Sequence, residues 1–235
     1  MATSGKKAWQ KGLDRIPQAV GEFPVEPANM ALLVIDMQYY VAHPDYGVLK
    51  NYIESDPEAA QYYSDRLKIV IPNCAKLLDF FRNNKMRVFY GCFGASLLDG
   101  SDLHPLRQAR LKEVPAFTTE DFEFKVLEEL EPQRGELVVA KSTRSAFMGT
   151  SLDHRMRRAG IDTVVVVGTA TDVCVGSTAR SAWDLGYKVI MVDDASAAFT
   201  EEDQIYTLRS WAAFFGKVMD TDELISNLQE KLQKK

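Results

Sequence analysis

The sequence predicts a three-layer, doubly wound α/β fold, in which helices cover both faces of a mostly parallel β-sheet. The first observation is a series of short apolar, β-branched runs that are continuous rather than alternating, as expected for strands buried on both faces. The second is that segments with helical spacing lie between these runs, a pattern typical of right-handed parallel crossovers. The third is the length of 235 residues, which is enough for one sizeable core.

The expected strands and helices alternate along the chain. Glycine just after the last helical residue is a common C-cap, and it marks the ends of two of the helices. Pro72 is expected to kink or interrupt the first long helix. Strands are expected at 31–35, 86–90, 136–140, 163–167, 187–192 and 217–219, and helices at 67–81, 152–159 before Gly160, 173–185 before Gly186, 202–214 and after Asp222.

Composition narrows the class of protein. With 46% apolar and 26% charged residues, the chain is neither disordered nor a collagen-like repeat. A net charge of −5 argues against nucleic-acid binding, which usually needs a basic surface. Cys74, Cys92 and Cys174 are too few and too far apart for a disulfide framework. We therefore expect reduced thiols in a cytoplasmic protein, and no apolar run is long enough to span a membrane, so no membrane partner is expected.

Two segments fit the alternating pattern less well. Residues 1–27 are expected to form an N-terminal arm, and 28–235 a single domain. Within that domain, residues 93–124 contain Pro105 and Pro115 and predict a long loop region. Loops of this length in a compact domain usually serve as active-site lids or as subunit contacts.

Three reactive side chains follow predicted strands, where ligands bind in open parallel sheets. Asp36 follows the first strand, Lys141 the third, and Cys174 lies a few residues beyond the fourth. Each has a structural alternative: a helix cap for the aspartate, a solvated lysine, and a packed cysteine. Their position on one edge of one sheet instead favours a reactive group of acid, base and thiol.

Together these residues can perform nucleophilic catalysis. The start of a helix and a nearby ammonium group both favour a thiolate at Cys174. Asp36 can take the thiol proton and return it to a leaving amine, while Lys141 stabilises the anion and orients the carboxylate. Backbone N–H groups of Cys174 and of the preceding turn can form an oxyanion hole.

Three motifs carry a resemblance to a known family. They are Leu32–Gln38 (Leu-Leu-Val-Ile-Asp-Met-Gln), Lys141–Phe147 (Lys-Ser-Thr-Arg-Ser-Ala-Phe) and Val167–Val175 (Val-Gly-Thr-Ala-Thr-Asp-Val-Cys-Val), the last continuing into Ser177–Arg180. In this order they resemble the isochorismatase-like cysteine hydrolases, which include N-carbamoylsarcosine amidase, biuret hydrolase, ureidoacrylate amidohydrolase and nicotinamidase. The resemblance spans about residues 28–228.

This resemblance implies a catalytic triad of Cys174, Asp36 and Lys141. It also implies a cis peptide bond before the nucleophile, expected at Ala170–Thr171, which would turn the N–H of Thr171 toward the oxyanion together with that of Cys174. Many members of the family act as oligomers, so a homodimer or homotetramer is expected.

Departures from the relatives bear on metals and substrate. Nicotinamidases carry a metal-binding Asp-x-His after the second strand, where this chain has only Gly91–Ser96 (Gly-Cys-Phe-Gly-Ala-Ser), so neither a metal nor another cofactor is expected. Isochorismatases proper lack the cysteine, so Cys174 argues against vinyl-ether chemistry. Arg144 stands where many relatives have tyrosine; it is either a ligand for a substrate carboxylate or a surface arginine.

Several further residues are candidates for the site. Gln38, Tyr39 and Phe147, with Arg144, are expected to bind substrate, although aromatic residues near strand ends often belong to the core. Cys92 ends the second strand and is expected to line the pocket, with no chemistry of its own. The pair 193–194, two aspartates after the fifth strand, is expected to cap or to form a turn.

The sequence thus predicts a cofactor-independent amidohydrolase that cleaves a C–N bond of a small carbamoyl, ureido or half-amide substrate through a thioester and releases ammonia. A metal-free nicotinamidase-like enzyme is one alternative. A thiol-based, peroxide-responsive protein on the same fold is another, since a low-pKa thiol also forms sulfenic acid. A dinucleotide-binding protein is disfavoured because Asp36–Tyr39 follows the first strand in place of a glycine-rich turn.

Overall fold

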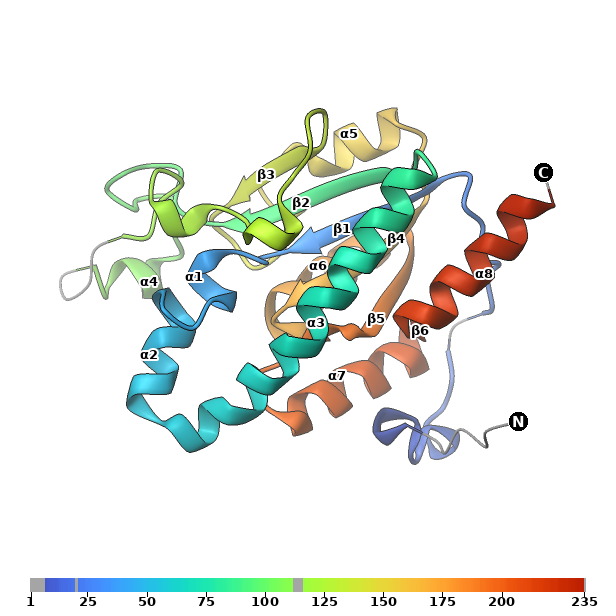
Figure 1. The fold of residues 1–235 in the computed structure, drawn as a ribbon, viewed down its shortest axis with the longest axis horizontal. Coiled ribbons are helices and arrows are strands. Elements are labelled where there is room, and N and C mark those ends of the chain that lie inside the picture. Colours follow the sequence, from blue (N-terminus) through green and yellow to red (C-terminus); the bar gives the residue numbers. More distant parts are fainter. Residues whose placement is uncertain (1–6, 20, 112–115, 235) are drawn as a thin grey trace.

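The computed structural model describes residues 7–19, 21–111 and 116–234, and a six-stranded sheet lies at its centre (Figure 1). The strands stand in the order β3-β2-β1-β4-β5-β6, and each neighbouring pair is parallel. The predicted doubly wound α/β fold is confirmed, and the sheet is parallel throughout. Its strands are β1 (Met30–Ile35), β2 (Arg87–Phe93), β3 (Leu137–Lys141), β4 (Thr163–Thr169), β5 (Lys188–Ala197) and β6 (Lys217–Met219).

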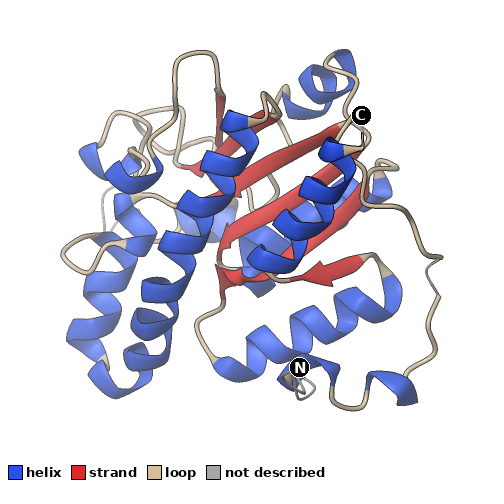
Figure 2. Ribbon diagram, turned by 45° about the vertical axis from the view of Figure 1, so that its right-hand side comes forward, coloured by secondary structure: helices blue, strands red, loops and turns tan. Residues whose placement is uncertain are grey.

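Helices cover both faces of this sheet (Figure 2). The α-helices are α1 (Tyr39–Ala42), α2 (Gly47–Ser55), α3 (Pro57–Asn83), α4 (Pro105–Gln108), α5 (Leu152–Arg158), α6 (Gly176–Asp184), α7 (Glu201–Phe214) and α8 (Thr221–Gln233). Short 3₁₀ turns stand at Ala8–Gln10, Leu13–Arg15, Phe122–Phe124 and Glu128–Leu130, and a π-helical turn at Thr171–Val175 precedes α6.

The alternation of side chains along β1 shows why the strand is apolar throughout. Met30, Leu32 and Val34 point into a core formed with α3 and α8. The intervening residues Ala31 and Leu33 point into a second core, formed with α5, α6 and α7. Every residue of β1 is buried, because successive strand residues face opposite sides of the sheet.

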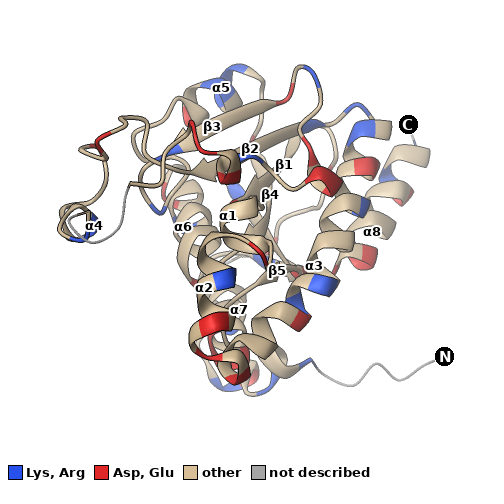
Figure 3. Cartoon of the chain, turned by 60° about the vertical axis from the view of Figure 1, so that its left-hand side comes forward, with Lys and Arg blue, Asp and Glu red and all other residues tan. Residues whose placement is uncertain are grey.

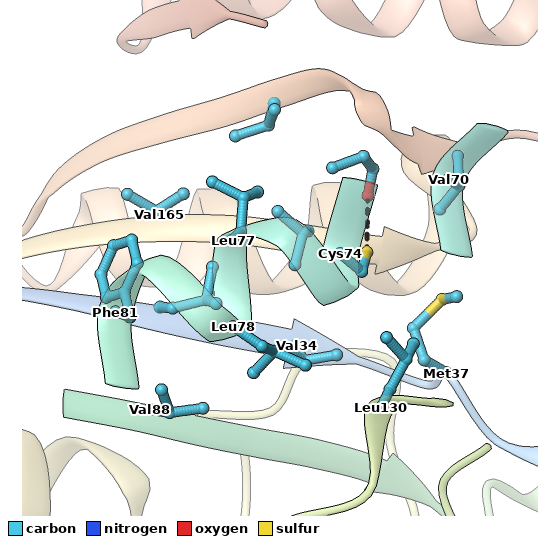
Figure 4. Close-up of a cluster of buried hydrophobic side chains, with 14 of the residues drawn as sticks. Val34, Met37, Val70, Cys74, Leu77, Leu78, Phe81, Val88, Leu130 and Val165 are labelled. Carbon is cyan, nitrogen blue, oxygen red and sulfur yellow. Dashed lines mark hydrogen bonds between the residues drawn. The ribbon is translucent and has the colours of Figure 1, made fainter. Parts of the chain in front are cut away.

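Helix α3 packs its apolar side on the sheet (Figure 4). Leu77 and Phe81 lie in the same cluster as Val34 of β1, and the thiol of Cys74 donates to the carbonyl of Ala195 at 3.4 Å. The sequence allowed an interruption of this helix at Pro72, but α3 continues through it. Pro72 lies on the exposed side, where the loss of one helical hydrogen bond leaves the packed side intact.

Strand β5 runs farther than its apolar residues indicate. A register irregularity after Val166 lets β5 pair with β4 as far as Ala197, so Asp193 and Asp194 lie inside the strand rather than after it. Asp193 accepts a hydrogen bond from Arg66 at 2.7 Å. Asp194 accepts from the N–H of the first residue of α8 at 2.8 Å, so the expected capping role holds for this residue alone.

The segments before β1 and between β2 and β3 lie outside the sheet. Trp9 is buried in the core beside α7, so the described part of the N-terminal arm packs on the domain, while its boundary at residue 27 stays a prediction. The segment 94–111 with α4 lies beyond the carboxyl end of β2, near α1 (Figure 1). Within residues 7–19, 21–111 and 116–234, no helix has both the length and the apolar character needed to cross a bilayer.

Candidate active site

The point where the strand order reverses lies between β1 and β4, and the crevice at such a point is the usual ligand site of this architecture. Asp36 follows β1 with φ +51°, a left-handed conformation that is unusual for a residue other than glycine. Gly168 near the end of β4 has φ +113°, and a Cβ there would clash with the carbonyl oxygen of Ile35. Close approach of the two strands therefore requires glycine at this position.

Asp36 and Lys141 form a buried ion pair at this edge. The ammonium of Lys141 donates to Oδ2 of Asp36 at 2.8 Å, and the N–H of Phe93 donates to Oδ1 at 2.8 Å. Asp36 is 2% exposed and Lys141 is 1% exposed. Burial acts to lower the pKa of Lys141, but the negative charge of Asp36, joined by that of the Cys174 sulfur once its thiol ionises, outweighs burial and the pKa is raised. The lysine is therefore a fixed positive charge.

Cys174 lies in the π-helical turn before α6 and is 5% exposed. Burial raises the pKa of its thiol to about 11, and the charge of Asp36 acts in the same direction. Lys141 and Arg144 lower the pKa, but by less. The expectation that the site favours a thiolate is therefore wrong for the free protein. Its thiol is protonated at neutral pH, beside a carboxylate that can accept the proton.

A cavity of about 190 Å³ opens on these groups. Cys174 and Asp36 line it together with Thr169 and Ala170 from the end of β4. Its other walls are aromatic and basic side chains. These are Tyr40, Phe93, Arg107, Arg144 and Phe199, with Val41, Val48 and Val173 between them.

The part of the chain that carries these residues also matches a known protein family. A model of the isochorismatase domain matches residues 30–223, well over half of the chain. The chain belongs to the isochorismatase family. The resemblance seen in the three sequence motifs is therefore confirmed, and the matched range contains Asp36, Lys141 and Cys174.

Relatives in the isochorismatase family include proteins named as amidohydrolases. The chain is 38% identical over 165 residues to the uncharacterised family protein YwoC of Bacillus subtilis (strain 168), covering 68% of this chain and 84% of YwoC. It is 28% identical to the ureidoacrylate amidohydrolase RutB of Pantoea ananatis, covering 86% and 82% of the two chains. The family thus includes enzymes that act on C–N bonds outside peptides, as predicted.

Solved structures of the family agree with the fold. A cysteine hydrolase from Pseudomonas syringae pv. phaseolicola 1448A aligns with a TM-score of 0.75 at 28% identity, over 91% of this chain and 99% of that chain. N-carbamoylsarcosine amidase from Thermoplasma acidophilum aligns with a TM-score of 0.61 at 29% identity, over 83% and 98%.

Of the four residues predicted to bind substrate, the structure places Arg144 alone in the wall of the Cys174 cavity. Gln38 is fully buried, and its side chain bonds to the backbone at Phe93 and Phe124. That amide fixes the loop after β2, which explains a polar residue in this position. Phe147 packs against Tyr187 in the core, with ring centroids 5.7 Å apart.

Tyr39 and Cys92 line a different cavity, of about 540 Å³, with Phe122 and Val138. Tyr40 faces the Cys174 cavity instead, because consecutive helical residues point about 100° apart. Cys92 is 1% exposed and belongs to the core cluster, and burial raises the pKa of its thiol far above the usual range. The expectation that it lines the pocket is wrong for the Cys174 cavity.

Tyr40 and Arg107 also line the Cys174 cavity, and the sequence did not single them out. Arg107 belongs to α4, within the segment that was expected to form a long loop. The available signal in the sequence was a basic residue in a long loop between two strands whose carboxyl ends lie at the edge with Asp36 and Lys141. It is weak, because the same segment also contains Arg110, which does not line the cavity.

The cis peptide bond lies one residue earlier than expected, between Thr169 and Ala170. The chain is already helical at Thr171, so the irregular peptide stands at the end of β4 and not inside the turn. In that turn the N–H groups of Val173 and Val175 both donate to the carbonyl of Ala170 at 3.0 Å.

A buried network supports this turn from behind. The hydroxyl of Thr171 donates to Oε1 of Gln204 at 2.7 Å, and the same oxygen accepts the N–H of Ala198 at 3.0 Å. The amide nitrogen of Gln204 donates in turn to Asp193 at 3.1 Å. The sequence indicated none of these contacts, since the partners are far apart along the chain.

Across the described ranges 7–19, 21–111 and 116–234, no group of three or more His, Cys, Asp or Glu side chains is placed to hold a metal ion. Next to the thiol, the side chains at hand are one carboxylate, one ammonium and two guanidinium groups. This set can move a proton, hold an anion and deliver a nucleophile.

Proposed function

We propose that this protein is a cysteine-dependent amidohydrolase that cleaves a C–N bond of a small carbamoyl, ureido or half-amide substrate through a thioester and releases ammonia. The observation that carries the proposal is the geometry of Asp36. Its carboxylate is held by Lys141 at 2.8 Å and lines the same cavity as the Cys174 thiol.

In the first half of the proposed reaction, Asp36 takes the thiol proton as the sulfur of Cys174 attacks the substrate carbonyl carbon. A tetrahedral oxyanion forms, and the backbone N–H groups of Cys174 and Thr171 are proposed to stabilise it. The C–N bond then breaks, and the leaving nitrogen takes the proton from Asp36 and departs as ammonia. The acyl group remains on the sulfur as a thioester.

In the second half, Asp36 takes a proton from water, and the resulting hydroxide attacks the thioester carbonyl carbon. The C–S bond breaks, the proton returns to the sulfur and the acid is released. Lys141 keeps its charge throughout, so that its role is to hold the carboxylate in place and to stabilise the thiolate. Homo-oligomer formation, as in the family, stays a prediction.

The raised pKa of the Cys174 thiol bears on the alternatives. Oxidation by peroxide requires a thiolate, and a thiol with a pKa of about 11 is mostly protonated at neutral pH. A peroxide-responsive role is therefore disfavoured. A nicotinamidase-like reaction uses the same three residues and differs only in its substrate, so it belongs in the assay panel.

The test is ammonia release from N-carbamoyl amino acids, biuret, maleamate and nicotinamide by the wild-type protein and by Cys174→Ala and Cys174→Ser. We expect activity on at least one of these amides, loss of that activity in Cys174→Ala, and an acyl adduct on the wild-type protein in intact mass spectra. Cys92→Ala is the matched control, because this thiol lies in the other cavity. Full activity of Cys174→Ala would refute the mechanism.

A further inference from the structure

Two arginines converge on one aromatic ring beside the nucleophile. The guanidinium carbon of Arg107 lies 4.5 Å from the ring centroid of Phe93, and that of Arg144 lies 6.0 Å from the same centroid. Both line the cavity that contains Cys174. They come from different segments, α4 and the loop after β3, so the fold assembles this pair.

The two arginines form a local excess of positive charge. Burial lowers the pKa of Arg107, and the like charge of Arg144 lowers it further. Within the described residues, neither guanidinium forms an ion pair with a carboxylate, whereas the nearby Lys141 is already neutralised by Asp36. Two like charges brought together in a partly buried site are unfavourable unless an anion binds between them.

Local contacts hold α4 in place. The side chain of His104 accepts the N–H of Leu106 at 3.2 Å, and the amide of Gln108 donates to two carbonyls of the preceding loop. Tyr40 of α1, which lines the same cavity as Arg107, stacks on Phe117 with ring centroids 3.7 Å apart. Figure 3 shows basic residues at α4, which projects beyond the sheet. Arg107 therefore extends from an ordered element toward the cavity.

We propose that Arg107 and Arg144 together bind a carboxylate of the substrate, so that the preferred substrate is a short carboxylic acid that also carries the amide or ureido group to be cleaved. A planar guanidinium pairs with a carboxylate through two parallel hydrogen bonds, and two such groups can hold both oxygens. This inference rests on the proposed amidohydrolase function and names the class of its substrate.

The size of the cavity limits the substrate further. At about 190 Å³ it is smaller than the roughly 300–1,000 Å³ of pockets for drug-sized ligands. Only a few atoms can separate the carboxylate from the scissile carbonyl. Ureido acids such as N-carbamoylglycine and half-amides such as maleamate meet both conditions, whereas biuret has the size but not the charge.

The test compares each acid with its neutral amide of the same shape: N-carbamoylglycine with N-carbamoylglycinamide, and maleamate with maleamide. Removing a charge-assisted hydrogen bond should lower kcat/KM for the acid by about 10–100-fold in Arg107→Gln, mainly through KM. The neutral partner should lose much less. Arg107→Lys should recover part of the loss, and Arg110→Gln, from the same loop but outside the cavity, should keep the wild-type ratio.

Titration calorimetry with the inactive Cys174→Ala protein tests the binding separately from the chemistry. We expect an acid of this panel to bind, its neutral partner to bind at least tenfold more weakly, and Arg107→Gln to remove the difference. If no amide is hydrolysed but this pattern holds, the proposed function fails and the anion site stands. The inference is overturned if no acid of the panel binds, or if Arg107→Gln weakens acid and neutral ligands equally.

Discussion

Replacing Asp36 by asparagine should move activity and thiol acidity in opposite directions. The substitution keeps the size of the side chain but removes the charge that faces both Lys141 and Cys174. Turnover should fall at least about 100-fold, because the group that accepts the thiol proton is lost. The pKa of the Cys174 thiol should nevertheless fall below its value of about 11, since Asp36 contributes to raising it.

The same substitution should also lower the stability of the fold, by an amount that can be worked out from the buried ion pair. Lys141 is 1% exposed, and leaving a buried charge without its partner costs about 3–5 kcal/mol. For a chain of this size each kcal/mol lowers Tm by about 2–4 °C, so the loss should be about 6–20 °C. Because the cost comes from the unpaired lysine, the double variant Asp36→Asn/Lys141→Met should recover much of the stability and none of the activity.

The assays are ammonia release, thermal unfolding, and the rate of alkylation by iodoacetamide between pH 7 and 11. Glu136→Gln is the matched control, because it breaks another partly buried ion pair, with Arg82, and should lower Tm without changing the alkylation profile. An Asp36→Asn protein that keeps wild-type turnover, or whose thiol titrates at the wild-type pH or above, would refute the reasoning.

Three further predictions concern Cys174 and its surroundings. In the wild-type protein, alkylation of Cys174 should rise about tenfold per pH unit to near pH 11, because a raised thiol pKa keeps the thiol protonated below that value; a plateau near pH 9 would contradict this. Gln204→Leu should cost about 1–3 kcal/mol in urea unfolding by leaving the Thr171 hydroxyl unpaired, and it should lower kcat more than it changes KM. Gly168→Ala should destabilise the fold by at least about 3 kcal/mol by the same measurement, while Gly135→Ala, also at positive φ but in open space, should cost about 1 kcal/mol.

The sheet could be predicted from the sequence because burial on both faces leaves a continuous apolar run at each central strand. The ends of the strands could not be predicted as well. The backbone of β5 keeps pairing through Asp193 and Asp194, whose side chains find Arg66 and the start of α8. Polar residues in a strand are tolerated when distant partners satisfy them, and a single sequence does not indicate those partners.

That the three residues proposed as catalytic lie together could be predicted for the same topological reason. The carboxyl ends of parallel strands meet at one edge, so the common position of Asp36, Lys141 and Cys174 could be inferred without knowing where their side chains point. The cavity walls depend on that direction. Tyr39 and Tyr40 are adjacent and chemically alike, yet they line different cavities, and only the fold of a loop brings Arg107 to the Cys174 cavity.

The proposed carboxylate site also has a consequence for the timing of proton transfer. Arg144 is one of the two groups that lower the pKa of the Cys174 thiol, and the other is Lys141. A bound carboxylate would neutralise part of the positive charge of Arg144, so binding of the substrate would make the thiol no more acidic. In the proposed mechanism a thiolate therefore does not accumulate before the reaction. The proton would pass to Asp36 as the sulfur attacks, and this requires the carboxylate to be held in place, at 2.8 Å from Lys141 and 2.8 Å from the Phe93 N–H, before the substrate arrives.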